Sequence, residues 1–418
     1  MKLLHTSDWH LGGKLHEQDR TREHEQFLEW LTTLLRAERP DALVIAGDVF
    51  DTFTPSNRAL ELYYSFLGEL FKASLCRAVV ITGGNHDSPS LLDSPEKILV
   101  HLNARVVGSA SDDPAQEVVW VQGEQAETGL VIGAVPYLRE GDLRCAASGE
   151  SEEERAAKLQ TGFRTHYARV AEAARLLSSA KTGFDVPLIL TGHCYLRNAM
   201  LSDDHSERAR AIGGLDGLSC TLLPPSDYLA LGHLHLPQTI GGNSARRYAG
   251  SPIPMSFAEA ETEKSVVLVT FGVRSGDPVD ARTIPVPVFQ KLKQLTGTPE
   301  TIKARLAELI TDGESVWTDV QVTEGEGELS AFWDETARLV MNTPVKILTR
   351  RNSRPARAWA GRGADEEIRL DTLTPNDVFR MRLDEESLAD EERQFYSTLF
   401  DELMRDVSAA RITAEVAP

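Results

Sequence analysis

Short apolar runs alternate with amphipathic stretches in the first hundred residues. The runs KLL, ALVIA and AVVIT start at residues 2, 42 and 78. A helix is expected over 21–38, where Phe27, Leu31 and Leu35 recur at helical spacing, and another over 56–72. This order of strands and helices, joined by short connections, predicts a layered α/β sheet.

The pattern changes after residue 106. Shorter, hairpin-like strands are expected over 106–137, and a solvated, charged segment over 149–158 leads into a helix near 162–179. Two further apolar strands, VPLIL and DYLAL, each run into a histidine. We expect this first domain to span residues 1–284.

A smaller unit follows over residues 285–365, in which apolar and amphipathic stretches give a compact β-α-β-α-β order. The tail, 366–418, contains a helix expected from Ser387, where Ser387 and Asp390 resemble a capping box. Its apolar stripe is too broad for a lone surface helix and needs a packing partner. The stripe consists of Phe395, Tyr396, Leu399, Phe400, Leu403, Met404 and Val407.

Composition is that of a globular protein of 418 residues with 41% hydrophobic and 26% charged content. No apolar run is long enough for a membrane span and the start does not resemble a signal peptide, so a cytoplasmic protein is expected. The cysteines are Cys76, Cys145, Cys194 and Cys220. They form no C-x-x-C pair, which favours reduced thiols over a zinc site or a disulfide framework.

The net charge of −19 argues against a nucleic-acid partner, since phosphates are bound by clustered Lys and Arg. The charge is unevenly spread, however, and residues 345–364 include Arg350, Arg351 and Arg354 but no acid. These arginines form either a solvated face or a contact with the DNA backbone. The turn at Gly250–Ser251, with Arg246 and Arg247 just before it, is equally open: Arg246, Arg247 and Ser251 either face a phosphate of DNA or do not.

Polar side chains gather at five expected strand ends. Because the carboxyl ends of parallel strands meet at one edge of a sheet, they should lie close together. Carboxylate, imidazole and amide ligands suit Mn, Fe or Zn better than Ca or Mg. A pair of ions needs a shared carboxylate, for which Asp48 is the candidate. The set consists of Asp8, His10, Asp48, Asp51, Asn85, His86, Asp87, His193, His233 and His235.

The order D-x-H, G-D-x-x-D, G-N-H-D, G-H and G-H-x-H resembles that of the calcineurin-like metallophosphoesterases. Within them, HTSDWHLG, AGDVFDT, GGNHDS, ALGHLH and AGSPIPMSF resemble the SbcD family of bacterial nuclease subunits over nearly the whole chain. The resemblance implies a layered β-sandwich flanked by helices, a small α+β capping domain that binds DNA, and a C-terminal helical tail.

The same resemblance implies two divalent ions, most of all Mn²⁺. One ion would be held by Asp8, His10, Asp48 and His235. The other would be held by Asp48, Asn85, His193 and His233. His86 would then stand beside the scissile phosphate as the proton donor to the leaving oxygen, with Asp87 as its orienting partner, a role that suits a histidine next to a ligand.

The activity implied is DNA hydrolysis in repair, recombination and replication: 3′–5′ exonuclease action on double-stranded ends, and endonuclease action on single strands and hairpins. The implied partners are a second copy, making a homodimer through the helix at 56–72, and an SbcC-type, SMC-like ATPase docked on the tail helices. The chain has no G-x-x-x-x-G-K-[ST] loop of its own. A nucleoid-associated enzyme is expected.

Two other functions fit parts of the pattern. A phosphodiesterase for small nucleotides or a phosphoprotein phosphatase would use the same metals, but would have little use for the small domain or the amphipathic tail. A scaffold that tethers DNA ends would not need a complete ligand set. Two residues also stay open: Asp51 either orients the ligands of the first ion or caps the next helix, and Cys194 is either a soft extra ligand or a buried bystander.

Overall fold

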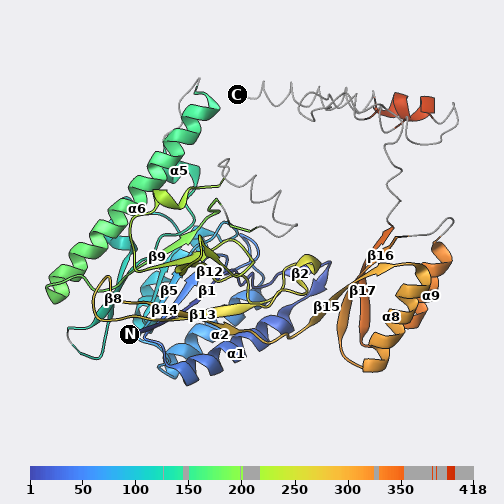
Figure 1. The fold of residues 1–418 in the computed structure, drawn as a ribbon, viewed down its shortest axis with the longest axis horizontal. Coiled ribbons are helices and arrows are strands. Elements are labelled where there is room, and N and C mark those ends of the chain that lie inside the picture. The colour runs from blue at the N-terminus through green and yellow to red at the C-terminus, as the bar shows by residue number, and fades with distance from the viewer. Residues whose placement is uncertain are drawn as a thin grey trace. The chain divides into compact units, whose positions relative to one another are not determined.

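The computed structural model describes residues 1–418 except 126, 145–149, 198, 201–216, 324–328, 353–378, 380–382, 384–392 and 401–418. The chain divides into two compact units, Met1–Pro355 and Ala356–Pro418. The first unit contains two six-stranded sheets and a separate three-stranded sheet (Figure 1).

The first large sheet has the order β14-β13-β1-β4-β5-β6. Its strands β1, β4, β5 and β6 are parallel, and β13 and β14 continue the sheet in antiparallel pairing. Every residue of β4 and β5 is buried, as expected for parallel strands covered on both faces. The bounds are β1 (Lys2–Thr6), β4 (Ala42–Ala46), β5 (Ala78–Thr82), β6 (Ala104–Val107), β13 (Ser265–Thr270) and β14 (Asp280–Pro285).

The second large sheet has the order β11-β12-β10-β9-β8-β7. One buried apolar cluster joins the two sheets face to face, with Val44 and Val80 from the first and Ile132 and Ile189 from the second. The predicted β-sandwich is therefore confirmed. The bounds are β7 (Val118–Gln122), β8 (Gly129–Gly133), β9 (Leu188–His193), β10 (Tyr228–Gly232), β11 (Gln238–Ile240) and β12 (Asn243–Tyr248).

Helices cover the outer faces of the sandwich. Helices α1 (Thr21–Glu38) and α2 (Asn57–Lys72) pack on the first sheet, and α6 (Glu152–Thr182) packs on the second. The expected start of α6 near residue 162 was wrong. Ser151 accepts from the Glu154 backbone and Glu154 caps in return, so the charged segment forms the first turns of the helix.

The remaining elements are short helices and a two-stranded antiparallel sheet of β2 and β3. They are β2 (Lys14–Leu15), β3 (Gln18–Asp19), α3 (Pro89–Asp93), α4 (Glu96–Leu99), η1 (Val100–Leu102), η2 (Pro114–Glu117), α5 (Glu140–Leu143), η3 (Cys220–Leu222) and η4 (Phe257–Glu259).

The three-stranded sheet and its two helices form a small module that has the predicted β-α-β-α-β order and its own core around Leu306 and Val320. The helices cover one face of this sheet, and the other face contacts the sandwich, where Leu292 and Trp317 pack against Leu15 and Phe257. The bounds are β15 (Lys291–Gly297), α8 (Pro299–Asp312), β16 (Val316–Val322), α9 (Ser330–Val340) and β17 (Val345–Asn352).

In the second unit the described residues are Phe379, Leu383 and 393–400, all of which are helical. The rings of Phe379 and Phe400 stack with centroids 3.9 Å apart. The expected cap at Ser387 and Asp390, and the stripe residues Leu403, Met404 and Val407, lie outside the described residues. Within the described part of the chain, no helix is long and apolar enough to span a membrane.

Candidate metal centre

The predicted polar residues come together because their five strands end at one edge of the sandwich. β1, β4 and β5 are neighbours in one sheet, and β9 and β10 are neighbours in the other. The backbones of Asp8, His10, Asp48 and His233 have positive φ angles of 52°, 46°, 49° and 99°. Such angles cost energy outside glycine and cluster at functional sites.

Backbone contacts hold these strained turns. Asp8 N donates to Gly47 O at 3.0 Å, and His10 N donates to Asp48 O at 3.0 Å, which ties the end of β1 to the end of β4. Gly47 has a φ of 84°, and a Cβ there would lie 2.1 Å from His193 Nδ1. Only glycine fits at this point, where the backbone runs directly beneath an imidazole.

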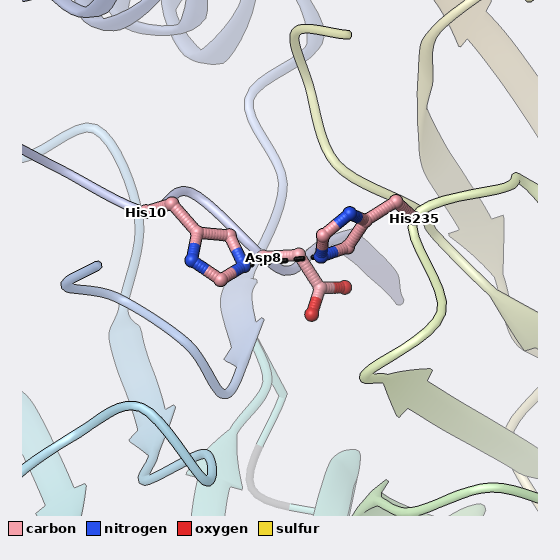
Figure 2. Close-up of side chains that lie close together, drawn as sticks. All are labelled: Asp8, His10 and His235. Carbon is pink, nitrogen blue, oxygen red and sulfur yellow. Dashed lines mark hydrogen bonds between the residues drawn. The ribbon is translucent and has the colours of Figure 1, made fainter. Parts of the chain in front are cut away.

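Asp8, His10 and His235 form the first cluster (Figure 2). His10 Nε2 lies 3.1 Å from His235 Nε2 and 3.6 Å from Asp48 Oδ2. All four side chains are buried. Nitrogen and oxygen lone-pair atoms therefore converge on one point from three strand ends, which is the arrangement a divalent cation requires.

Asp48, Asn85, His193 and His233 form the second cluster. Asn85 Oδ1 lies 3.0 Å from His193 Nε2 and 2.9 Å from His233 Nδ1. Asp48 Oδ2 lies 3.2 Å from His193 Nε2, so the same oxygen atom faces both clusters. Its other oxygen accepts from His86 N at 2.9 Å. Asp48 thus has the geometry expected of a shared carboxylate.

The hydrogen-bond roles around His193 fit a cation. His193 Nδ1 lies 3.0 Å from Ala46 O, which can only accept, so this nitrogen carries a proton. In the neutral ring Nε2 is then an acceptor, yet it faces two further acceptors, Asp48 Oδ2 and Asn85 Oδ1. Three lone pairs meeting in a buried space require a cation or an additional proton.

The electrostatics give the same picture. Burial alone would lower the pKa of His193, but the Asp48 carboxylate outweighs it and raises this pKa to about 9. Burial would raise the pKa of Asp48, but His193 and His10 hold it well below its usual range. Burial raises the pKa of Asp8 to about 6. These buried carboxylates depend on positive charge located between them.

Asp51 lies beside His10 and not at a helix start. Its Oδ1 is 3.3 Å from His10 Nδ1, on the side of the ring opposite the cluster. Helix α2 is capped by Ser56, whose side chain accepts from Ala59 N. The geometry favours the orienting role for Asp51 over the capping role.

His86 lies at the rim, half-buried, with its ring 4.9 Å from that of His10. Its Nδ1 donates to Asp51 O at 2.8 Å. The expected partner Asp87 was wrong, because its carboxylate accepts from the backbone of Val49, Phe50 and Gly84. Asp87 therefore joins the loops after β4 and β5, and a backbone carbonyl orients His86.

Two charged residues that the sequence patterns did not single out lie behind the first cluster. Glu259 Oε1 is 3.6 Å from His235 Nδ1, and Glu259 Oε2 accepts from Lys264 Nζ at 2.5 Å. The only signal for Glu259 was its place two residues after the AGSPIPMSF segment. Lys264 also donates to Ser251 Oγ at 3.0 Å.

At Ser251 the structure contradicts the alternative of a DNA contact. Its side chain is completely buried and donates to Ile253 O at 2.9 Å. Arg246 and Arg247 belong to β12 and pair with Leu229 and Ala230 of the neighbouring strand β10. They therefore lie before the end of β10, which is followed by His233. Neither arginine belongs to either cluster.

Cys194 follows His193 but joins none of the potential ligand groups among the described residues. Its side chain packs with the apolar cluster under α6, and burial raises its pKa to about 12. A neutral thiol in an apolar environment is a poor ligand, so the geometry favours the buried bystander.

The two described arginines of the basic segment lie on opposite faces of the small module. Arg350 stands over the Trp333 ring at 5.6 Å, on the face covered by the helices. Arg351 lies 3.3 Å from Asp319, on the other face, together with Trp317. Arg354 lies outside the described residues.

The sandwich and its two clusters define a calcineurin-like phosphoesterase, and the model of that family matches residues 1–237. A second family model, the Type 5 capsule protein repressor C-terminal domain, matches residues 288–387. The SbcD subunit of the SbcCD nuclease of Escherichia coli K12 is 35% identical over 406 residues, which cover 96% of this chain and 97% of that protein. The corresponding protein of Rhodobacter capsulatus is 32% identical over 315 residues, which cover 74% of this chain and 76% of that protein.

The chain therefore belongs to the SbcD family of nuclease subunits. It is a metal-dependent phosphodiesterase of the nuclease class.

Proposed function

We propose that the chain cleaves DNA at a two-ion site. Asp8, His10 and His235 would hold one ion, Asn85, His193 and His233 the other, and Asp48 both. The observation that carries the proposal is the position of Asp48 Oδ2, between His10 Nε2 at 3.6 Å and His193 Nε2 at 3.2 Å. The mixed nitrogen and oxygen ligands suit Mn, Fe or Zn, and among these the resemblance to the family favours Mn²⁺.

A pair of divalent ions supplies electrostatic stabilisation of the phosphate charge when bound. The protein's own part in the reaction is proton transfer by His86. The proton donor is the imidazolium form of His86, in which both ring nitrogens are protonated: Nδ1 donates to Asp51 O, and Nε2 gives its proton to the departing sugar oxygen, which leaves the neutral ring. The half-buried position of His86 at the rim suits contact with a substrate that approaches from solvent. No covalent enzyme intermediate is involved.

We propose the activities and substrates that the family implies. These are 3′–5′ exonuclease action on double-stranded ends and endonuclease action on single strands and hairpins, in DNA repair, recombination and replication. In this proposal residues 1–284 are the nuclease domain and 285–365 the DNA-binding capping domain. The relatives named as SbcCD nuclease subunits support it. Such an enzyme would act in the cytoplasm at the nucleoid.

Residues 366–418 would dock on an SbcC-type ATPase. Phe395, Tyr396 and Leu399 are 63%, 45% and 52% exposed on the helical stretch 393–400, an apolar surface suited to helix-against-helix binding. A homodimer contact through α2 is supported by its exposed rings Tyr64 and Phe71. Both contacts would bury apolar side chains that are costly to leave in water.

The experiment measures Mn²⁺-dependent cleavage of single-stranded, hairpin and blunt duplex DNA by the purified chain, with and without an SbcC-type partner. We expect cleavage of single strands by the chain alone and of duplex ends with the partner. Turnover of a small phosphodiester such as bis-p-nitrophenyl phosphate, without cleavage of any DNA, would instead support the small-nucleotide alternative.

A further inference from the structure

The short turn η4 (Phe257–Glu259) touches two separate parts of the molecule. Glu259 is 1% exposed and points its carboxylate at His235 Nδ1, 3.6 Å away. Phe257 is 3% exposed and packs against Leu292 and Trp317 of the small module. Two residues of one turn thus connect the metal centre with the module.

We propose that Glu259 is a positioning residue for the ligand His235, and that the docked small module keeps Glu259 in place through η4. The proposal deepens the proposed function, because it rests on the two-ion site. It assigns to the small module a role in the binding of the first ion, in addition to contact with DNA.

The carboxylate of Glu259 is fixed from several sides. Its Oε2 accepts from Lys264 Nζ at 2.5 Å and from Met255 N at 3.1 Å, which leaves Oε1 directed at His235. Lys264 Nζ donates in addition to His235 O at 2.8 Å. The backbone and the ring of His235 are therefore held by the two members of one buried ion pair.

A buried ion pair of this kind is a weak source of stability, because desolvation of both charges offsets their attraction. Its value here is directional. A carboxylate at Nδ1 fixes the imidazole tautomer and turns Nε2 towards the cluster, where it lies 3.1 Å from His10 Nε2. A carboxylate in that position also makes the imidazole a stronger ligand.

Two of the other ligand histidines, His10 and His193, are oriented from within the sandwich. His10 is paired with Asp51, in the loop after β4, and His193 with the carbonyl of Ala46, in β4 itself. His235 differs because its carboxylate partner belongs to a turn that packs on the module. Glu261, two residues further on, also reaches Lys293 of β15 at 3.0 Å, although both side chains are largely exposed.

Loss of module docking should therefore weaken the binding of the first ion and leave the binding of the second ion unchanged. The test is a Mn²⁺ titration of the full-length, metal-free chain, followed by the electron paramagnetic resonance signal of free Mn²⁺, without DNA. Glu259→Gln keeps the size of the side chain and removes its charge. We expect it to weaken one of two Mn²⁺ sites about 10- to 100-fold and leave the other unchanged. Glu263→Gln, at an exposed position four residues after Glu259, is the matched control and should leave both unchanged.

Trp317→Ala tests the link to the module. We expect it to weaken the same site by a few-fold to about tenfold, and to have a smaller effect in the Glu259→Gln background, because the two changes act on one chain of contacts. Circular dichroism shows whether Trp317→Ala folds. If it does not, Trp317→Phe takes its place, and the expected result is again weaker Mn²⁺ binding at the same site.

Unchanged Mn²⁺ binding in Glu259→Gln would overturn the positioning role. Unchanged binding in the folded Trp317 variant, with only a lower melting temperature, would overturn the link to the module. Because the titration contains no DNA, its outcome is independent of the proposed activity. A wild-type chain that binds two ions without cutting DNA would contradict the proposed function but not the positioning role of Glu259.

Discussion

His10 Nε2 and His235 Nε2 lie 3.1 Å apart in the interior, although the two residues are separated by 225 positions in the sequence (Figure 2). Each ring has a carboxylate on its far side: Asp51 lies 3.3 Å from His10 Nδ1, and Glu259 lies 3.6 Å from His235 Nδ1. The two imidazoles are thus held facing each other, which would lower the cost of reorganising the site when the proposed ion binds.

The shared carboxylate gives the first prediction. Asp48→Asn removes the charge that both clusters face, so we expect weaker binding of both Mn²⁺ ions and a loss of nuclease activity of at least about 100-fold. A Mn²⁺ titration and a cleavage assay on the same preparation measure the two effects. Glu124→Gln, at a side chain that is 87% exposed, is the control. Two intact Mn²⁺ sites in Asp48→Asn would refute the sharing.

The buried histidine His24 gives a prediction for stability. Burial lowers its pKa from 6.5 to about 3, so the folded chain keeps it neutral while the unfolded chain takes up a proton below pH 6.5. The unfolded state binds more protons in that window, and the contribution of His24 therefore disfavours folding as the pH falls through 6.5.

We expect the free energy of unfolding, measured by urea titration with saturating Mn²⁺, to change less between pH 7.5 and 5.5 in His24→Leu than in wild type. The difference should be about 1 kcal/mol. His101→Gln, at an exposed position, should behave as wild type. Identical pH dependence in wild type and His24→Leu would show that His24 is not held neutral.

The opposite faces of the small module give a prediction for DNA binding. Arg351 shares its face with Trp317, which packs towards the metal-bearing sandwich, whereas Arg350 lies with Trp333 under the helices. We expect Arg351→Gln to reduce the slope of log K against log salt by about 1 and Arg350→Gln to leave it unchanged. Fluorescence anisotropy over a series of salt concentrations measures both. The reverse result would place the DNA on the helical face.

The tail helix gives a prediction for the partner. Leu399→Asp places a charge in the exposed apolar stripe, and should weaken binding to an SbcC-type ATPase at least about tenfold without changing cleavage of single strands by the isolated chain. Thr398→Asp puts the same charge on an exposed neighbour outside the stripe. Equal binding by both variants would locate the contact elsewhere.

Much of this architecture could be predicted because the pattern was local. The apolar runs ALVIA and AVVIT became fully buried parallel strands, and residues at their ends, such as Asp48 and Asn85, met because parallel strands end on the same side. The helix at 21–38 follows directly from its apolar spacing and has the predicted bounds.

What the sequence did not predict depends on contacts between distant segments. Glu259 and Lys264 follow no spacing rule, and their role appears only when η4 lies against His235. Asp87 was wrongly expected to orient His86, because no sequence pattern indicates that backbone amides will donate to its carboxylate. Ser251 was considered as a phosphate contact because a Gly-Ser turn next to arginines does not reveal that its hydroxyl is buried and bonded to Lys264.

The most direct measurement compares wild type with His86→Ala in a Mn²⁺-dependent assay on single-stranded DNA, with bound Mn²⁺ counted in the same samples. His86 donates to a backbone carbonyl and faces the rim, so we expect two bound ions in both proteins and cleavage slower by about 100- to 10,000-fold in His86→Ala. Cleavage at the wild-type rate by a fully metal-loaded His86→Ala chain would contradict the assignment of His86 as the proton donor at a two-ion nuclease site.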